Sequence, residues 1–403
     1  MNTRKRVLFF GEPATLAHVM RPVVLASALP SRLYDVAVAT GADYRRFVER
    51  EGLEVRDLWS IGTRAYLAAV EAGRVVFPFR TLDAYVREDM RHIEAFAPDL
   101  VVGDFRLSLA VSARLAKVRY VAISNAYWSP CARARYEIPV HPTTKLLGPA
   151  VPNALFQLLR PAILAHHSLP MHKLRKRYGM RSLGFDLGTV FTEADVTAYA
   201  DVPAIVPGAD CGNQRRYRYI GPVLWSPGGV LPAALEERGD GRPWVYVSMG
   251  SSGNPHLVPT LLAALEGVDC RVAVATAGAV PASAIPSGVI AADYLPGDEA
   301  AARASLVICN GGSPSAYQAL AQGTPVLGIP ANLDQMLNMH FVVRSGAGAA
   351  LRADRVTRKR VADVVKHMLQ TPAFGAQAKK IAAVFHEYHA TARFANIVRE
   401  LAP

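Results

Sequence analysis

Short apolar runs alternate with longer amphipathic segments along the whole chain. The apolar runs at residues 7–10 and 36–40 are separated by a segment that predicts a helix from about His18, which Pro30 stops. A second series of the same kind begins at residues 245–248. Strands that alternate with helices are typical of a mainly parallel sheet covered by helices on its faces. The pattern therefore predicts an α/β protein.

The apolar runs define a set of expected strands, and the segments between them are expected to be helical. The predicted strands are residues 7–10, 36–40, 100–103, 120–124, 189–191, 219–221, 245–248, 271–276, 289–291, 306–309 and 326–329. Residues 107–116 and about 376–401 are predicted helices. The region from Asn125 to Ser182 is less regular, and we expect it to form helical excursions from the first domain.

A cluster of Pro and Gly residues between 225 and 243 interrupts this pattern and is the best candidate for a linker. With 403 residues the chain is about twice the size of a comfortable single domain. We therefore expect an N-terminal domain at 1–224, a linker at 225–243 and a C-terminal domain at 244–375. Residues 376–403 are expected to hold the last helix.

Composition restricts the class of protein. Hydrophobic residues make up 51% of the chain and charged residues 19%, which is typical of a globular protein. The four cysteines form no CxxC pair, and no His cluster has ligand spacing, so we expect neither a disulfide scaffold nor a metal site. No stretch approaches the roughly 20 apolar residues of a spanning helix. These features fit a cytoplasmic protein, or one that associates with a membrane surface.

The net charge of +12 is concentrated in one segment. Residues 105–185 hold thirteen Lys or Arg and only one acidic residue, Glu137, so the rest of the chain is neutral. A solvated helical face is the plain interpretation. The alternative is a patch that attracts an anionic acceptor or an anionic membrane, with Tyr127 and Trp128 among its aromatic residues. Nucleic acid is not expected as a partner, because no recognised binding module is present.

Two glycine-serine loops follow predicted strands of the second domain. Glycines allow a ligand to approach the backbone, and free N–H groups at a helix start favour an anion. Because both loops lie at the carboxyl ends of parallel strands, we expect a diphosphate site there, although an ordinary turn explains each loop alone. Neither a Walker loop nor a GxGxxG motif occurs. The candidate residues are Ser248, Gly250, Ser251, Ser252, Asn310, Gly311, Gly312, Ser313 and Ser315.

Residues 289–338 resemble the donor-binding signature of the family 1 nucleotide-sugar glycosyltransferases of the GT-B fold. The matching pieces are Asp293-Tyr-Leu-Pro296, Asn310-Gly-Gly312, Gln318, Gly323-Thr-Pro-Val-Leu327 and Pro330-Ala-Asn-Leu-Asp-Gln335. The similarity extends to residues 219–223 and 245–251. It implies two Rossmann-like domains that face each other across a cleft containing the ligand, with the last helix crossing back to the first domain.

The resemblance also implies roles on the donor side. Tyr294, followed by Leu295, would stack on the nucleotide base, and the two loops would hold the diphosphate. Gln318 would face the ribose, and Asp334 with Gln335 would bind the hydroxyls of the transferred sugar.

The chain departs from the family pattern on the donor side. Asn310 stands where the family usually has His, Gln318 where it has Glu, Tyr294 where it has Trp, and Gly297 where it has Gln. A Glu carboxylate accepts from both hydroxyls of a ribose, whereas a Gln amide offers one carbonyl oxygen. Because a deoxyribose presents only one hydroxyl there, Gln318 favours dTDP-sugars over UDP-sugars as donors.

The first domain carries the candidate catalytic residues. His18 resembles the general base of the family's His-Val-x-(x)-Pro segment, and Asp104 resembles its carboxylate partner. A neutral imidazole can take the proton of an attacking hydroxyl, and a carboxylate on its other nitrogen fixes the tautomer. Backbone amides would stabilise the leaving diphosphate without a metal. Glu12 is the alternative base. The plain interpretation of His18 is a helix cap or a solvated side chain, and that of Asp104 is a cap of the next helix.

The sequence thus predicts an inverting, metal-independent glycosyltransferase of the hexosyltransferase type, with no cofactor beyond its UDP- or dTDP-sugar co-substrate. The acceptor would be a hydroxyl of an apolar or anionic small molecule or of a glycolipid, near Glu12, Tyr127 and Trp128. Two alternatives remain at this point: a non-catalytic nucleotide-sugar-binding protein and an epimerase on the same fold.

Overall fold

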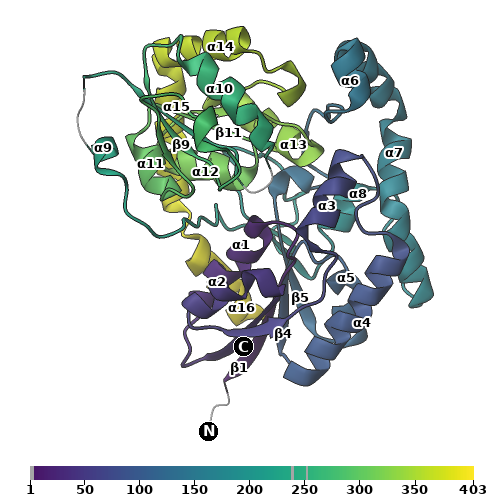
Figure 1. The fold of residues 1–403 in the computed structure, drawn as a ribbon. Helices are drawn as coiled ribbons and strands as arrows, with labels where there is room; N and C mark the ends of the chain where they lie inside the picture. Colours follow the sequence, from purple (N-terminus) through teal and green to yellow (C-terminus); the bar gives the residue numbers. More distant parts are fainter. Residues whose placement is uncertain (1–3, 237–239, 251–252) are drawn as a thin grey trace. The chain divides into compact units, whose positions relative to one another are not determined.

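The computed structural model describes residues 4–236, 240–250 and 253–403, and it divides into two compact units (Figure 1). Unit 1 comprises Met1–Arg133, Leu158–Val223 and Tyr388–Pro403, and unit 2 comprises Ala134–Gln157 and Leu224–Glu387. Each is built around one parallel sheet, which confirms the predicted α/β class.

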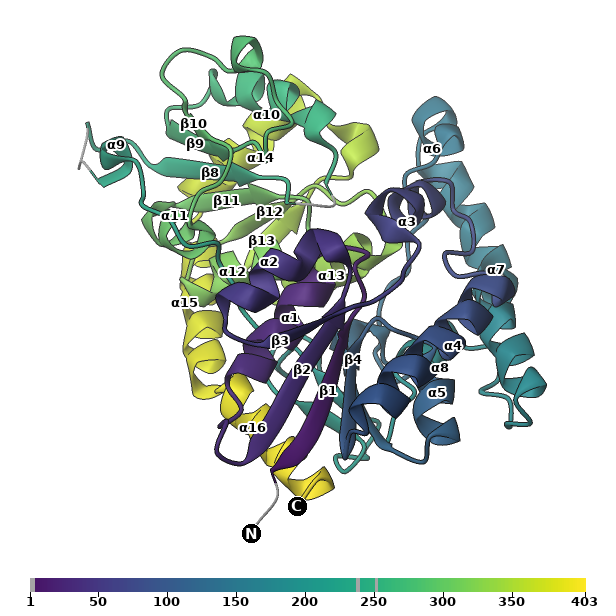
Figure 2. The same cartoon turned by 60° about the horizontal axis from the view of Figure 1, so that its bottom comes forward.

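The sheet of unit 1 has seven strands in the order β3-β2-β1-β4-β5-β6-β7, all parallel (Figure 2). Its strands are β1 (Lys5–Gly11), β2 (Tyr34–Thr40), β3 (Glu54–Asp57), β4 (Leu100–Asp104), β5 (Arg119–Ser124), β6 (Val196–Tyr199) and β7 (Tyr217–Tyr219). Its helices are α1 (Leu16–Ser27), α2 (Arg45–Arg50), α3 (Gly62–Glu71), α4 (Phe79–Phe96), α5 (Leu109–Leu115), α8 (Leu187–Phe191) and α16 (Ala390–Leu401).

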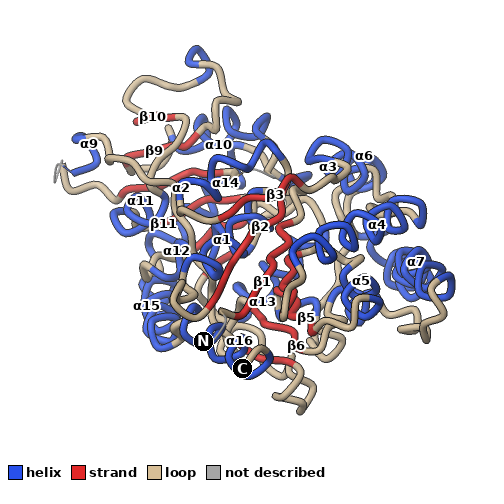
Figure 3. Tube along the Cα trace, turned by 90° about the horizontal axis from the view of Figure 1, so that it is seen from below, coloured by secondary structure: helices blue, strands red, loops and turns tan. Residues whose placement is uncertain are grey.

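Alternate residues of β1 pack on opposite faces of this sheet. Leu8 and Phe10 belong to a buried cluster with Ile93 of α4 and Leu109 of α5. Phe9 points to the other face, where its ring lies 5.9 Å from that of Phe394 in α16. Figure 3 shows helices on both sides of the strands. Because both faces are covered, β1 is apolar over four consecutive residues instead of alternating, as expected for a parallel strand.

The sheet of unit 2 has six parallel strands in the order β10-β9-β8-β11-β12-β13. They are β8 (Trp244–Ser248), β9 (Arg271–Ala275), β10 (Ile290–Ala292), β11 (Leu306–Cys309), β12 (Val326–Gly328) and β13 (Gly348–Ala350). The helices are α6 (Pro142–Leu147), α9 (Ala233–Glu236), α10 (Val258–Leu265), α11 (Gly297–Arg303), α12 (Ser313–Ala321), α13 (Leu333–Arg344), α14 (Arg358–Gln370) and α15 (Pro372–Glu387).

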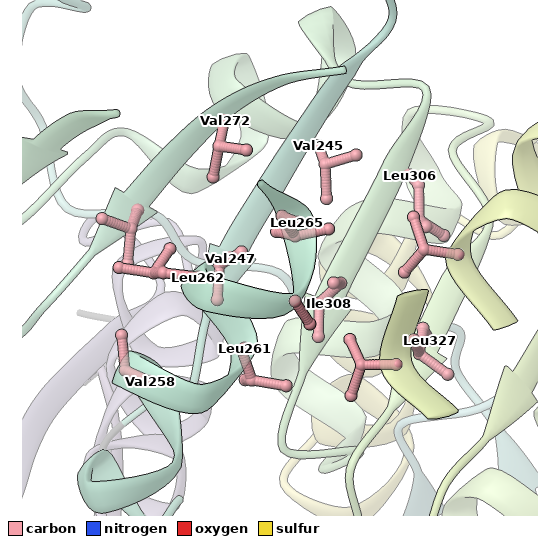
Figure 4. Close-up of a cluster of buried hydrophobic side chains, with 14 of the residues drawn as sticks. Val245, Val247, Val258, Leu261, Leu262, Leu265, Val272, Leu306, Ile308 and Leu327 are labelled. Carbon is pink, nitrogen blue, oxygen red and sulfur yellow. The ribbon is translucent and has the colours of Figure 1, made fainter. Parts of the chain in front are cut away.

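The core of unit 2 lies between α10, α14 and one face of its sheet. Val245 and Val247 of β8 and Ile308 of β11 meet Leu261 of α10 there (Figure 4). These strand residues are fully buried. The core fixes the directions of β8 and β11, which end at the two glycine-rich loops.

The compact units depart from the predicted domain boundaries at two places. Residues 134–157 group with unit 2, although they lie within the first half of the sequence, and the chain rejoins unit 1 at Tyr388. The long helix α7 (Ala150–Arg177) contains the point at which unit 2 ends, at Gln157, and unit 1 resumes, at Leu158. The predicted last helix is two helices, α15 and α16, separated at Tyr388 and His389.

Two other local predictions are wrong. Residues 189–191 belong to the short helix α8, which Asp186 caps through the backbone N–H of Thr189, and the strand follows at β6. A three-residue apolar run is too short to distinguish a strand from a helical turn. Cys131 and Cys211 form a disulfide, although no disulfide was expected. They are 80 residues apart in sequence, and only the adjacency of β5, β6 and β7 brings their loops together.

The basic segment is less free than its composition suggested. Arg106 is fully buried, and Arg114, Arg119 and Arg177 form ion pairs with acidic residues outside the segment. Part of the predicted excess is therefore used inside unit 1. Among the described residues, no helix combines the length and apolarity needed to cross a membrane.

Candidate active site

The first group of site residues lies where β1 and β4 end in unit 1. Asp104 is the last residue of β4, and His18 lies in the first turn of the helix that follows β1. The Nδ1 atom of His18 is 2.8 Å from Oδ1 of Asp104. Nη2 of Arg21 also lies 3.2 Å from this Nδ1. A carboxylate only accepts, so in the tautomer that makes the bond to Asp104 Nδ1 carries the hydrogen, and the lone pair of Nε2 is left to take a proton. The structure thus brings these two predicted residues together.

Arg21 is a third member of this group that the sequence analysis gave no role. Its Nε donates to Oδ2 of Asp104 at 2.7 Å and its Nη2 to Oδ1 at 2.8 Å, a two-pronged pairing with one carboxylate. Burial opposes the charge on Arg21, but Asp104 more than compensates, so the pKa of Arg21 lies above its ordinary value. Arg21 is three residues after His18 on α1, a spacing that places both on one helix face.

A chain of hydrogen bonds continues from Arg21 into the neighbouring strands. Its Nη1 donates to Oδ1 of Asn125 at 2.7 Å, and Nδ2 of Asn125 donates to Asp201 at 3.1 Å. The backbone N–H of Ala126 donates to the same carboxylate at 2.7 Å. The side chains of Arg21, Asp104, Asn125 and Asp201 are all almost fully buried. Arg21 thus holds the carboxylate of Asp104, and Asn125 and Asp201 hold Arg21 in turn, so the imidazole meets a preorganised partner.

Aromatic side chains surround the imidazole. Phe105 follows Asp104 directly and has a φ of 58°, a left-handed conformation that is uncommon for a bulky residue. This backbone places its ring against His18, with the centroids 4.6 Å apart and the planes at 13°. Phe191 packs on Phe105, and Trp128 packs on Phe191. Of the three predicted acceptor residues, Glu12 and Tyr127 are buried and Trp128 is half-buried.

Glu12, the alternative base, belongs to a different and fully buried group. Its Oε2 accepts from Nη1 of Arg106 at 2.8 Å, and its Oε1 accepts from the hydroxyls of Ser60 and Tyr85. Nε of Arg106 also donates to Asp89 at 2.8 Å. Glu12 has no exposed surface, so it does not meet solvent. Its carboxylate instead connects Arg106, Ser60 and Tyr85 through hydrogen bonds.

The second group of site residues lies in unit 2, where β8 and β11 end. Gly250 has a φ of 61° and lies beside the other loop: a Cβ there would stand 3.3 Å from Oγ of Ser315 and 3.5 Å from Nδ2 of Asn310. Asn310 is buried, and its Oδ1 accepts from the backbone N–H of Gly312, the residue that caps α12. The structure therefore brings the two loops into contact, as expected for residues at the carboxyl ends of parallel strands.

The start of α12 lies at this contact. Ser313 begins the nine-residue helix, Pro314 occupies its first turn, and Gly311 turns the chain with a φ of 81°. The first turn of α12 itself contains no acidic side chain, which suits its N–H groups to an anion. The other predicted loop residues, Ser251 and Ser252, lie outside the described residues.

Substituting Gly250 tests whether this contact is a ligand site. In Gly250→Ala a methyl group occupies the space between the loops, and we expect the Kd of a nucleoside diphosphate to rise about tenfold, which is about 1.4 kcal/mol. Gly288→Ala is the matched control: Gly288 also has a positive φ, and a Cβ there meets nothing within 4 Å. Calorimetric titration measures both variants. Equal affinity in the two variants would contradict the assignment.

Gln318 and Gly297 are coupled in space. A Cβ at position 297 would stand 2.4 Å from Oε1 of Gln318, so the Gln318 side chain fills the volume that a side chain at 297 would need. Its Nε2 donates to the carbonyl of Trp225 at 3.2 Å. Tyr294 is 68% exposed, as a stacking platform requires, whereas Leu295 is buried. The two departures from the family pattern, at Gly297 and Gln318, therefore depend on each other, because the Gln318 side chain needs the space that Gly297 leaves.

The predicted sugar-binding residues differ in their surroundings. Asn332 and Gln335 form a capping box at the start of α13, in which Oε1 of Gln335 accepts from the backbone N–H of Asn332 at 3.4 Å. The same oxygen also accepts from the backbone N–H of Ala331 at 2.9 Å. Gln335 is 2% exposed, so its amide oxygen serves the helix start. Asp334 is half-buried in the first turn.

The remaining candidates for site chemistry are the thiol of Cys309 and groups of side chains that could bind a metal ion. Burial raises the pKa of the Cys309 thiol to about 12, so this residue at the end of β11 stays protonated. Within the described part of the chain, no three His, Cys, Asp or Glu residues are grouped so that they could hold a metal ion.

Comparison with known proteins identifies the family. A Mycobacterium tuberculosis protein described as "PGL/p-HBAD biosynthesis glycosyltransferase" is 43% identical over 382 residues, which cover 95% of this chain and 89% of that protein. The chain belongs to the family 1 glycosyltransferases of the GT-B fold. The predicted family is confirmed, and the protein is a nucleotide-sugar glycosyltransferase.

Further matches agree with this family. A "PGL/p-HBAD biosynthesis rhamnosyltransferase" from Mycobacterium bovis is 41% identical over 382 residues, which cover 95% of this chain and 84% of that protein. The family model "Erythromycin biosynthesis protein CIII-like, C-terminal domain" matches residues 259–401. The solved structure of the "Glycotransferase of kitacinnamycin" superposes with a TM-score of 0.74 at 18% identity, covers both chains completely and supports the fold alone.

Proposed function

We propose that this glycosyltransferase moves a deoxyhexosyl group, of the rhamnosyl type, from a dTDP-sugar to a hydroxyl of an apolar acceptor in glycolipid synthesis. The 41% identity to a rhamnosyltransferase supports the sugar class, and the glycolipid acceptor is taken from the names of the relatives. The observation that carries the mechanism is the 2.8 Å bond from His18 Nδ1 to Asp104, which leaves Nε2 ready to accept a proton.

The reaction follows from this arrangement. The acceptor hydroxyl gives its proton to Nε2 of His18 while its oxygen attacks the anomeric carbon of the donor, and the bond from that carbon to the diphosphate oxygen breaks. Asp104 stabilises the imidazolium that forms. Backbone N–H groups at the start of α12 stabilise the negative charge on the departing diphosphate. A single in-line displacement of this kind inverts the anomeric centre.

The proposal is tested by following nucleotide release and product formation with dTDP-rhamnose and a long-chain alkyl phenol or its rhamnoside as acceptor. We expect a product whose anomeric configuration is opposite to that of the donor, which NMR coupling constants establish. A product with retained configuration would contradict the mechanism. Donor binding without any transfer to these acceptors would favour the non-catalytic alternative.

The choice between dTDP and UDP depends on Gln318. Its Nε2 is engaged by the carbonyl of Trp225, so its single carbonyl oxygen is the group that can accept from a nucleotide hydroxyl. We expect the wild-type protein to bind dTDP at least as tightly as UDP. In Gln318→Glu the bond to Trp225 is lost, because a carboxylate cannot donate, while a second acceptor is gained for a ribose.

Calorimetric Kd values for both nucleotides measure this effect. We expect the Kd ratio of UDP to dTDP to fall about threefold or more in Gln318→Glu, a change of about 0.7 kcal/mol. Gln377→Glu, a substitution of the same type on α15 away from both loops, is the matched control and should leave the ratio unchanged. Tighter UDP binding by the wild-type protein would refute the preference for dTDP.

A further inference from the structure

The helix α7 exposes a continuous apolar face. Val151, Leu155, Leu158 and Leu159 are 68%, 56%, 76% and 45% exposed, and Ala162 is exposed too. They follow the spacing i, i+4, i+7, i+8, i+11, which places them on one side of a helix. A water-exposed helix face of a globular protein is normally polar, so this face is inverted relative to expectation.

The opposite side of α7 is buried in the normal way. Phe156, Met171 and Leu174 are between 0% and 6% exposed, and Ser168 is fully buried. The side chains that hold α7 against the rest of the protein are therefore distinct from those on the exposed apolar face. The packing of the buried side chains therefore does not explain why the exposed face is apolar.

Two cations continue the same face. Lys173 and Lys176 lie 22 and 25 positions after Val151, which corresponds to about the same side of the helix at 100° per residue. Both are exposed. The face is therefore apolar over its first three turns and cationic near its end, and no acidic residue occurs between residues 138 and 185. The nearby carboxylate of Asp83 already pairs with Arg87 and Arg177.

The short helix α6, which directly precedes α7 in the sequence, also exposes apolar side chains. Leu146 and Leu147 are 84% and 62% exposed, and the exposed Lys145 precedes them. This helix is anchored within unit 2, because the hydroxyl of Thr144 donates to Asp354 at 2.5 Å. The leucines are thus presented by a fixed element. We define the membrane face by the residues of the single helix α7, which are Val151, Leu155, Leu158, Leu159, Lys173 and Lys176.

We propose that the membrane face binds the surface of an anionic lipid bilayer. An apolar stripe enters the boundary between headgroups and acyl chains, while lysines beside it attract anionic headgroups. Charge favours an anionic bilayer over a second copy as the occupant, because residues 138–185 offer no acidic side chain to the lysines of another copy of the same face. This proposal concerns where the protein works, and it stands independently of the donor and acceptor proposed above.

Co-sedimentation of the full-length protein with vesicles tests the proposal. We expect binding to phosphatidylglycerol–phosphatidylcholine vesicles that weakens as salt rises, and little binding to phosphatidylcholine alone. The double variant Leu155→Ser/Leu158→Ser should lower the partition coefficient about tenfold. The double variant Lys173→Gln/Lys176→Gln should lower it at low salt and flatten its salt dependence. Val230→Ser, at another exposed valine, is the matched control and should bind like the wild type.

The outcomes separate this proposal from its alternatives. Circular dichroism and transfer to a water-soluble acceptor should be unchanged in every variant, since these side chains face solvent. Absence of wild-type binding to anionic vesicles, or wild-type binding by the double serine variant, would overturn the proposal. A dimer in light scattering that the serine variant dissociates, without vesicle binding, would assign the face to self-association instead. Failure of the transfer reaction with intact vesicle binding would count against the proposed function only.

Discussion

His18→Ala is expected to lower kcat by about three orders of magnitude while the Kd of the nucleotide stays within about twofold of the wild-type value. General bases contribute about 10²- to 10⁴-fold to rate, and Nε2 of His18 is the atom that takes the acceptor proton in the proposed mechanism. The loops proposed to hold the diphosphate belong to unit 2, whereas His18 belongs to unit 1, so the substitution should leave nucleotide binding intact. Initial rates and calorimetric titration measure the two effects.

The control for this prediction is His256→Ala, which removes an exposed imidazole from unit 2 and should leave kcat unchanged. Added imidazole should restore part of the His18→Ala activity, because it supplies the missing base to the space that the side chain vacates. A variant that keeps more than about a tenth of the wild-type rate would remove His18 from the role of base.

Arg106→Met is expected to destabilise unit 1 by about 3–5 kcal/mol. Removing one partner of a buried ion pair leaves an uncompensated charge, and here both Glu12 and Asp89 would lose the guanidinium that balances them. The side chain is 0% exposed and also stacks on Tyr85, with its Cζ atom 3.6 Å from the ring centroid. Differential scanning calorimetry should show Tm lower by on the order of 10 °C.

Arg32→Met is the matched control, because Arg32 is exposed, and it should shift Tm by less than about 2 °C. Arg106→Lys should fall between the two, since it keeps the charge but cannot donate to Glu12 and Asp89 from a planar fork. An Arg106→Met protein as stable as the Arg32→Met protein would show that the three charged groups are rearranged or hydrated without loss.

The parallel sheets and most of their strands were predictable, because the buried strands are continuous apolar runs that contrast with the helices between them. The contact between the glycine loops was predictable too, since the carboxyl ends of parallel strands meet at one edge. The pairing of His18 with Asp104 came from the family resemblance together with that same rule. Each of these depends on local pattern or on simple topology.

Other features depend on contacts that local pattern does not encode. Thr144 and Asp354, which anchor α6 in unit 2, are 210 residues apart, and nothing in the sequence near either one indicates its partner. The disulfide likewise depends on the order of three strands. The pairing of Arg21 with Asp104 could have been predicted. Arg21 is three residues after His18 on a predicted helix, so it lies on the same helix face, toward the end of the strand that carries Asp104. Glu12 was named as the alternative base from its place in the loop after the first strand, and a loop position does not reveal the full burial that the structure shows.

The chain completes unit 1 with its own last residues. Phe394 of α16 is fully buried and packs on Phe9 of the first strand. During synthesis the part of the N-terminal sheet that packs on α16 therefore stays uncovered until this helix has left the ribosome. Phe9 and Phe394 are 385 positions apart in sequence, so apolar surface of the sheet is exposed to aggregation over most of the synthesis of this chain.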